Sequence, residues 1–370
     1  MRHLTFLIIA LMLCISGYSQ QWSVKQANDW YAKQPWLVGC NFLPSTAINQ
    51  IEMWQSSTWD EKTIKKELDW AADLGFNTVR VYLHDLVYRT EKKAFLKKMN
   101  LFLEFCAKRN IKPLFVFFDD CHYAKPEMGK QPEPVPGVHN SGWKQSPGYH
   151  TTLAYEKNTI SKADRKALEK YVKGVLTHFK NDDRILGWDV YNEVGQSGNK
   201  STKLLLDTWE WAWKVRPLQP LTACVAGAAN NDAKKINARN SDVYSFHNYS
   251  SPEGFRNSVA HAVKEAKGRP IFCTEYMART TDNTFQNCMP TFKEKHIACW
   301  NWGFVDGKSA TKWAWSSRKY KPGDAIPTPT TDPKTVSTDP PLWFHDIFRL
   351  DGTPYKKEEV KFIKEIISKK

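Results

Sequence analysis

The 370-residue sequence predicts a single (β/α)8 barrel, and three observations lead to this prediction. Short apolar runs alternate with amphipathic helical patterns along most of the chain, which is typical of a parallel sheet covered by helices. The apolar runs are nearly continuous, as expected for strands that are buried on both faces. The main alternative is an open doubly wound sheet, which needs a glycine-rich phosphate turn after an early strand. No GxGxxG motif or P-loop is present, so the barrel is favoured.

Eight apolar runs supply the expected strands, in chain order. They cover residues 36–42, 78–83, 114–118, 185–193, 221–227, 243–247, 270–275 and 298–303. Helical spacing of apolar residues predicts helices between them. These helices cover residues 61–74, 91–109, 162–179, 205–212, 254–267 and 284–296, and a last one at 356–367 closes the chain.

Two long loops are expected at one end of this barrel. Residues 119–160 are rich in proline, glycine and histidine and follow the third strand. Residues 321–341 hold six prolines and almost no large apolar side chains, and they follow the eighth strand. Because only about thirty residues come after them, too few for a second core, we expect a loop and not a linker between domains.

The N-terminus has the pattern of a secretory signal peptide. A charged start, an apolar run over residues 4–15 and small residues just before Gln20 indicate cleavage at that point. The sequence thus predicts a signal peptide over residues 1–19 and one barrel domain over residues 20–370. The apolar run is too short to span a bilayer, and no later run approaches that length. We therefore expect an exported protein, periplasmic or extracellular, without a transmembrane anchor.

Charge and cysteine content narrow the possible partners. The chain has 53 Lys and Arg against 39 Asp and Glu, a formal charge of +14, but the basic residues are interleaved with acidic ones. Without a basic arm or zinc finger, nucleic-acid binding is not expected. Loss of Cys14 with the signal peptide leaves seven of the eight cysteines, so a monomer, which we expect, has at least one free thiol. No CxxC pair or zinc spacing occurs, and no metal or cofactor is expected.

Aromatic residues are abundant, with 16 Trp, 14 Tyr and 19 Phe. Tryptophan offers a flat apolar face with a polar edge, and an excess of it is typical of surfaces that stack on planar or amphipathic ligands. Most of these side chains are still expected to fill the core.

Two glutamates, Glu193 and Glu275, end apolar strands at the face where barrel enzymes carry their functional groups. A carboxylate buried there without a partner is costly. Two carboxylates across a barrel mouth can cleave a glycosidic bond, because one protonates the leaving oxygen while the other attacks the anomeric carbon or activates water. Each glutamate alone could instead pair with an arginine or cap a helix.

The residues around these glutamates favour the catalytic interpretation. Asn192-Glu193 ends the fourth predicted strand and Glu275 ends the seventh. Over residues 36–318 the sequence resembles the clan A glycoside hydrolases, which are retaining enzymes on (β/α)8 barrels, and most closely the cellulase-like family 5 group. The resemblance implies that Glu193 is the acid/base and Glu275 the nucleophile.

The same resemblance implies roles for other strand-end residues. Arg80 would keep the nucleophile ionised, and His247 and Tyr249 match a His-x-Tyr motif after strand six. Asn192 would bond the sugar 2-hydroxyl, and Trp300 would be the sugar-platform tryptophan on strand eight.

The exit from the third strand departs from the family pattern. It reads Asp119-Asp120-Cys121-His122 where the cellulase-like group has a His-rich turn, and we expect His122 to contact substrate. Asp119, Asp120 and His122 could also ligate a cation, but a hydrogen-bonded loop is favoured. Further substrate-binding candidates, each also compatible with simple packing, are the loop tryptophans Trp143, Trp313, Trp315 and Trp343.

The sequence therefore predicts an exported retaining β-glycosidase that hydrolyses O-glycosidic bonds of a poly- or oligosaccharide without a cofactor. Retention requires carboxyl groups ~5–5.5 Å apart, whereas ~6.5–9.5 Å indicates inversion. Limited solvation and the nearby Glu275 are expected to raise the pKa of Glu193. The alternatives are a non-catalytic carbohydrate-binding barrel and a transglycosylase that uses the same residues.

Overall fold

The computed structural model describes residues 21–122, 124–226, 231–319 and 327–369. The predicted signal peptide, residues 1–19, lies outside this range and stays a prediction. So do residues 321–326 of the second long loop.

Eight parallel strands form one sheet in the order β5-β4-β3-β2-β1-β8-β7-β6. They are β1 (Val38–Asn41), β2 (Thr78–Tyr82), β3 (Lys112–Asp119), β4 (Gly187–Asn192), β5 (Leu221–Thr222), β6 (Tyr244–Asn248), β7 (Ile271–Tyr276) and β8 (Ala298–Asn301). Because the last strand, β8, pairs with the first, β1, and the two edge strands, β5 and β6, are consecutive in the chain, the sheet forms a nearly closed barrel. The predicted (β/α)8 barrel is confirmed.

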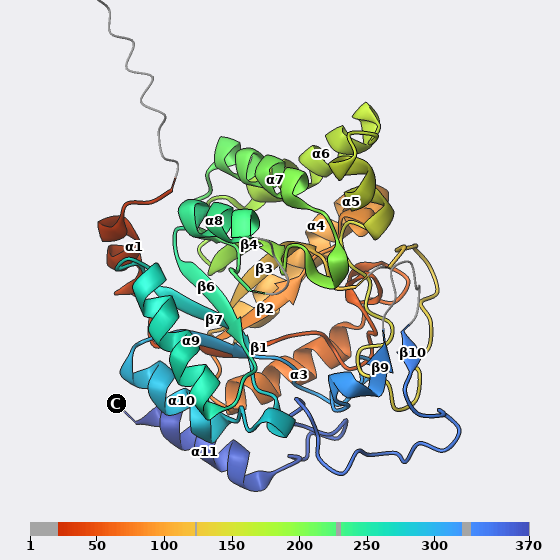
Figure 1. Ribbon diagram of the computed structural model, residues 1–370, viewed down its shortest axis with the longest axis vertical. Helices are drawn as coiled ribbons and strands as arrows, with labels where there is room; N and C mark the ends of the chain where they lie inside the picture. The colour runs from red at the N-terminus through yellow and green to blue at the C-terminus, as the bar shows by residue number, and fades with distance from the viewer. Residues whose placement is uncertain (1–20, 123, 227–230, 320–326, 370) are drawn as a thin grey trace, which may run out of the picture.

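Helices surround this sheet on its outer side (Figure 1). They are α1 (Val24–Tyr31), α2 (Gln50–Trp54), α3 (Glu61–Asp73), α4 (Asp85–Ala107), α5 (Tyr149–Glu156), α6 (Lys162–Phe179), α7 (Thr202–Val215), α8 (Asn231–Asn240), α9 (Pro252–Glu265), α10 (Phe285–Glu294) and α11 (Lys357–Ser368). A small antiparallel pair, β9 (Arg318–Lys319) and β10 (Thr328–Pro329), lies beyond the eighth strand. None of the helices in the described ranges combines the length and apolarity that crossing a membrane requires.

Local sequence explains where the well-predicted helices begin. Ser161 accepts a hydrogen bond from the Asp164 backbone N–H at the start of α6. Ser251 caps α9, with Pro252 at the first helical position, where its missing N–H is not needed. These caps place the helix starts within two residues of the predictions.

Several elements differ from the sequence-based expectation: helices α1, α2 and α8 were not expected, and α4 begins at Asp85, before the predicted helix 91–109. Helix α5 interrupts the predicted loop 119–160, and it was not expected because its first turn has no side-chain cap and its apolar residues follow no clear stripe. Over the described residues 221–226, the predicted strand 221–227 shortens to Leu221–Thr222, and the Ala223 N–H donates to the Ser241 hydroxyl and not to a neighbouring strand.

The amino-terminal end of the barrel is closed by a separate apolar group, here called the floor cluster. Its members come from the first residues of strands, or just before them, and from α1: Tyr31, Leu37, Leu114, Leu186, Val243, Phe272, Ala298 and Trp300. Trp300 is fully buried, and its indole N–H donates to the Thr78 hydroxyl at 3.2 Å. The floor cluster leaves the opposite end of the barrel as the place for polar chemistry.

Candidate active site

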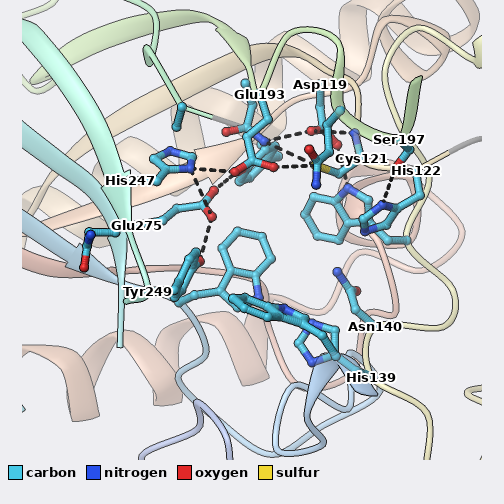
Figure 2. A pocket seen from close by; sticks show the side chains of 18 of the residues that line it. Asp119, Cys121, His122, His139, Asn140, Glu193, Ser197, His247, Tyr249 and Glu275 are labelled. Atoms are coloured by element: carbon cyan, nitrogen blue, oxygen red, sulfur yellow. Dashed lines mark hydrogen bonds and ion pairs between the residues drawn. The ribbon is translucent and has the colours of Figure 1, made fainter. Parts of the chain in front are cut away.

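A cavity of about 660 Å³ opens where the carboxyl ends of the strands meet. Figure 2 shows that Glu193, His247, Tyr249 and Glu275 point toward one another on one side of it, while His122, His139 and Asn140 lie on the other. The site therefore joins β4, β6 and β7 with the loops that follow β3 and β8.

Glu275 on β7 accepts three hydrogen bonds although it is only 5% exposed. Its Oε1 accepts from Arg80 Nη1 at 2.9 Å and from the Tyr82 hydroxyl at 2.8 Å. Its Oε2 accepts from the Tyr249 hydroxyl at 2.7 Å. The contact with Arg80 that the resemblance implied is present, and both oxygens of this carboxylate are fixed in place.

Arg80 on β2 is the fully buried cation of the site. Besides Glu275, it donates from Nη2 to Asp189 Oδ2 at 2.8 Å and to Asn192 Oδ1 at 2.7 Å. Its Nη1 also donates to Asn41 Oδ1 at 2.9 Å. One guanidinium thus balances two buried carboxylates, those of Asp189 and Glu275.

Asn192 and Glu193 leave β4 in different backbone conformations. Asn192 is the last strand residue, and its amide is oriented by the Arg80 donor and by donation to Asp119 Oδ1 at 2.8 Å. Glu193 adopts φ +44°, in the left-handed region that few non-glycine residues occupy. Such conformations cluster at functional sites, and this one turns the Glu193 side chain toward Glu275.

Glu193 has one partner on each oxygen. Its Oε1 lies 2.9 Å from His247 Nδ1, and its Oε2 accepts from the Cys121 thiol at 3.1 Å. His247 Nδ1 also lies 3.5 Å from Glu275 Oε2. A carboxyl oxygen of Glu193 and one of Glu275 lie within 4.8 Å of each other. The two carboxyl groups are therefore close neighbours with the imidazole between them.

The electrostatics of Glu193 differ from the prediction of a raised pKa. Burial raises the pKa of Glu193, but the hydrogen bond and charge of His247 outweigh it, helped by Cys121 and Arg80, so the pKa is lowered. Burial would lower the pKa of His247, but Cys224 and the carboxylates Glu275 and Glu193 raise it well above its usual value. Both pKa shifts favour a Glu193 carboxylate and a protonated His247 before substrate binds.

The loop that follows the third strand is held by hydrogen bonds, the arrangement that the sequence favoured over a cation site. Asp119 accepts from Asn192 and from the Trp143 indole N–H at 2.6 Å, and burial still raises its pKa to about 7. Asp120 accepts from the Tyr191 and Ser201 hydroxyls and from the Gly195 N–H.

His122 lies in the cavity wall, where the sequence placed it. Its Nδ1 is 2.9 Å from the Ser197 hydroxyl, and its Nε2 accepts from Arg318 at 3.0 Å. Burial and the Arg318 charge lower the pKa of His122 well below its usual value. The imidazole facing the cavity is therefore neutral.

Two of the predicted substrate-binding tryptophans are misplaced. Trp300 belongs to the floor cluster and does not reach the cavity, because on β8 it pairs opposite Gly39 on β1, below the mouth. Trp313 does not line the cavity either, and its carbonyl oxygen accepts from His139 Nδ1. Trp143 does line the cavity, as predicted, with 5% of its surface exposed.

Of the other loop tryptophans, Trp315 lines the cavity. Trp343 is fully buried and stacks on Tyr355 instead.

Several cavity residues were not predicted as part of the site. Trp302, two positions beyond Trp300, lines the cavity and packs edge-on against Tyr82 and Trp143. Tyr82 could have been found, because it lies two residues after Arg80 and strand alternation puts both on one face. Cys121 gave no signal, since a thiol in a loop is usually a small hydrophobe.

The family of the chain follows from comparison with known families. Residues 41–308 match the family model described as cellulase, glycosyl hydrolase family 5. The chain belongs to glycosyl hydrolase family 5. Its membership of glycoside hydrolase clan A, which the sequence resemblance implied, follows from this family. No curated protein matches the chain.

Solved structures with the same barrel are distant in sequence from this family 5 chain. The exo-β-1,4-mannosidase Op5Man5 from Opitutaceae bacterium strain TAV5 has a TM-score of 0.57 and 17% identity over 90% of this chain and 59% of its own. GH5_18 from Streptomyces cattleya, in complex with GlcNAc, has a TM-score of 0.55 and 15% identity over 90% of this chain and 80% of its own. XacCel5A in complex with cellopentaose has a TM-score of 0.53 and 15% identity over 89% of this chain and 98% of its own. At these identities the likeness shows the fold.

The family 5 chain spans less than two thirds of the first of these structures. Its own activity therefore has to be argued from its own residues.

Glu193, His247 and Glu275 are also the one group of histidine, cysteine and acidic side chains in the described ranges that is close enough to hold a metal ion. Arg80 already pairs with Glu275, and His247 carries the proton of its pair. A further cation would meet both positive charges, which disfavours a metal ion between these three side chains.

Proposed function

We propose that this family 5 enzyme is a retaining β-glycosidase that hydrolyses O-glycosidic bonds of a poly- or oligosaccharide by double displacement. Glu275 is the nucleophile and Glu193 the acid/base. The observation that carries this proposal is the closeness of the two carboxyl groups, with oxygens within 4.8 Å, since inversion needs a wider gap to admit water.

The surroundings of Glu275 suit a nucleophile. Its carboxylate accepts from Arg80, Tyr82 and Tyr249, and these donors hold it in one orientation below the cavity. Attack on the anomeric carbon forms a covalent glycosyl-enzyme and releases the aglycone. Because the cationic Arg80 lies beneath it, Glu275 is restored as a stable carboxylate when water later cleaves the intermediate.

The surroundings of Glu193 suit an acid that later becomes a base. His247 Nδ1, 2.9 Å from Oε1, can pass its proton to the carboxyl group, which gives it to the leaving oxygen. In the second step Glu193, again a carboxylate, takes a proton from the attacking water. Asn192, fixed by Arg80 and Asp119, is placed to bond the sugar 2-hydroxyl.

A panel of aryl β-glycosides and polysaccharides tests the proposal. It should include β-mannosides and β-glucosides, because an exo-β-1,4-mannosidase and a complex with cellopentaose occur among the structures with this fold. Proton NMR of the first product should show the β-anomer. An α-anomer would overturn retention, and no product from any substrate would favour the non-catalytic carbohydrate-binding barrel.

We also propose that the chain is exported, on the basis of the charged start and apolar run of residues 1–19. N-terminal sequencing of the protein recovered from the periplasm or the medium should begin at Gln20. Recovery of the protein only from the cytoplasm, with Met1 retained, would contradict export.

A further inference from the structure

The thiol of Cys121 contacts the side chain of the acid/base, and neither the family pattern nor the sequence accounts for this contact. Cys121 follows β3, and its Sγ lies 3.1 Å from Glu193 Oε2 (Figure 2). The other six described cysteines are buried free thiols, whereas Cys121 is partly exposed and lines the cavity. This sulfur is therefore placed against the reacting carboxyl group and not in the core.

Independent contacts fix this thiol. The Cys121 backbone N–H donates to Asp119 Oδ1 at 3.1 Å, and Asn192 Nδ2 lies 3.9 Å from the sulfur. The side chain also packs against the apolar group formed by Tyr82, Val116 and Trp143. The loop thus fixes the sulfur within hydrogen-bond distance of Glu193 Oε2.

The thiol is a hydrogen-bond donor here and not a thiolate. Burial and the neighbouring carboxylates Asp119, Glu193 and Glu275 raise the pKa of Cys121 well above its usual value. The S–H proton therefore stays on sulfur and points to the Glu193 carboxylate. A thiol is a weaker donor than a hydroxyl, so it orients the carboxylate while stabilising its charged form only slightly.

We propose that Cys121 is a positioning residue for the acid/base: it orients Glu193 through a weak S–H···O bond that leaves the carboxyl group easy to protonate. The inference rests on the acid/base role proposed above for Glu193. His247 already favours the charged form of Glu193, so a second strong donor would hold the carboxyl group ionised and unable to act as an acid.

The charged and titratable groups that face Glu193 come from five strands and their exits. They are Arg80 on β2, Asp119 and Cys121 at β3, Cys224 beyond β5, His247 and Tyr249 at β6, and Glu275 on β7, with Glu193 itself at the end of β4. Only the donor at position 121 changes in the variants below, so a shift in titration reports on that donor.

The pH profile of kcat/KM for an aryl β-glycoside with a poor leaving group provides the first test. Its alkaline limb reports loss of the proton shared by Glu193 and His247. In Cys121→Ser, the stronger donor should move this limb down by about half a pH unit, and in Cys121→Ala loss of the donor should move it up by a similar amount. Cys106→Ala, which removes a buried thiol from α4, should leave the limb in place.

Leaving-group dependence separates positioning from general damage to the site. A 2,4-dinitrophenyl glycoside needs no proton to depart, so Cys121→Ala should stay within about twofold of the wild type in kcat/KM. With a phenyl glycoside the same variant should lose about tenfold. Equal losses on both substrates, or limbs that coincide in all variants, would overturn the inference.

A spectroscopic test does not depend on turnover. The S–H stretching band of Cys121, identified as the infrared difference between the wild type and Cys121→Ala, should shift toward a weaker hydrogen bond in Glu193→Gln. An unshifted band would overturn the contact even if the enzyme were inactive. Conversely, failure of every substrate in the panel with a shifted band would reject the proposed function but keep the thiol contact.

Discussion

The two ends of the barrel are built on opposite principles. The floor cluster is apolar, and its two polar side-chain groups each find a partner: the Trp300 indole donates to the Thr78 hydroxyl and the Tyr31 hydroxyl to the His296 carbonyl. The mouth is a network of buried charges around Arg80, Glu275 and Glu193. Burial of apolar area stabilises the floor, whereas the mouth places charges where burial is costly. The comparison indicates that the floor serves stability and the mouth serves chemistry.

The largest expected effect separates chemistry from stability at the mouth. Glu275→Gln should reduce kcat by about 10⁴-fold or more, because an amide cannot form the glycosyl-enzyme. Since the amide oxygen can still accept from Arg80, the free energy of unfolding should change by less than about 2 kcal/mol. Steady-state kinetics and urea unfolding measure the two quantities.

Glu294→Gln, an exposed glutamate on α10, serves as the matched control and should change neither quantity. Substantial activity in Glu275→Gln would break the assignment of chemistry to this end of the barrel.

Arg80 contributes to both stability and chemistry, so its replacement should reduce both. Arg80→Met leaves Asp189 and Glu275 buried without a countercharge, which should cost about 3–5 kcal/mol of unfolding free energy. It should also lower kcat/KM by about 10²-fold or more, because Glu275 loses a donor and Asn192 its orientation.

The comparison variant for Arg80 is Arg109→Met, which breaks a pair with the exposed Asp69 and should cost less than about 1 kcal/mol. Equal stability losses in the two arginine variants would contradict the central position of Arg80.

At the floor, Trp300→Ala should lower the free energy of unfolding and leave the kinetics unchanged. Removing a fully buried indole should cost about 3–5 kcal/mol in urea unfolding. The KM of the molecules that stay folded should be unchanged, because Trp300 does not line the cavity. If Trp300→Ala instead raised KM without loss of stability, Trp300 would contact the sugar after all.

The smallest expected effect is at Trp302, two residues further along. Trp302→Ala should raise KM about tenfold through loss of a stacking face, with a smaller change in unfolding free energy than Trp300→Ala. Kinetics with the best oligosaccharide of the panel measure the change. If the two tryptophan variants behave alike, the division between floor and mouth is wrong.

The contrast between Trp300 and Trp302 also shows how far the sequence could lead. Strand type, order and the strand-end glutamates were predictable, because apolar runs and the glutamates that end them can be read locally. Which of two tryptophans reaches the mouth depends on where β8 ends and on its register against β1, and a shift of two residues moves a side chain from floor to mouth.

The partners of Glu193 could not be predicted for a different reason. His247 and Cys121 are 54 and 72 residues away from it along the chain, and only the closed barrel brings them to its two oxygens. The expected rise in the pKa of Glu193 considered burial and Glu275. It missed the imidazole at 2.9 Å, which reverses the direction.

Trapping of the covalent intermediate tests the account most directly. A 2-deoxy-2-fluoro glycosyl fluoride of the sugar found in the panel should inactivate the enzyme, since fluorine slows hydrolysis of the glycosyl-enzyme more than a good leaving group slows its formation. Peptic digestion and tandem mass spectrometry should locate the sugar on Glu275. A label on Glu193, or on neither glutamate of an enzyme that the reagent inactivates, would contradict the assignment of the two carboxylates.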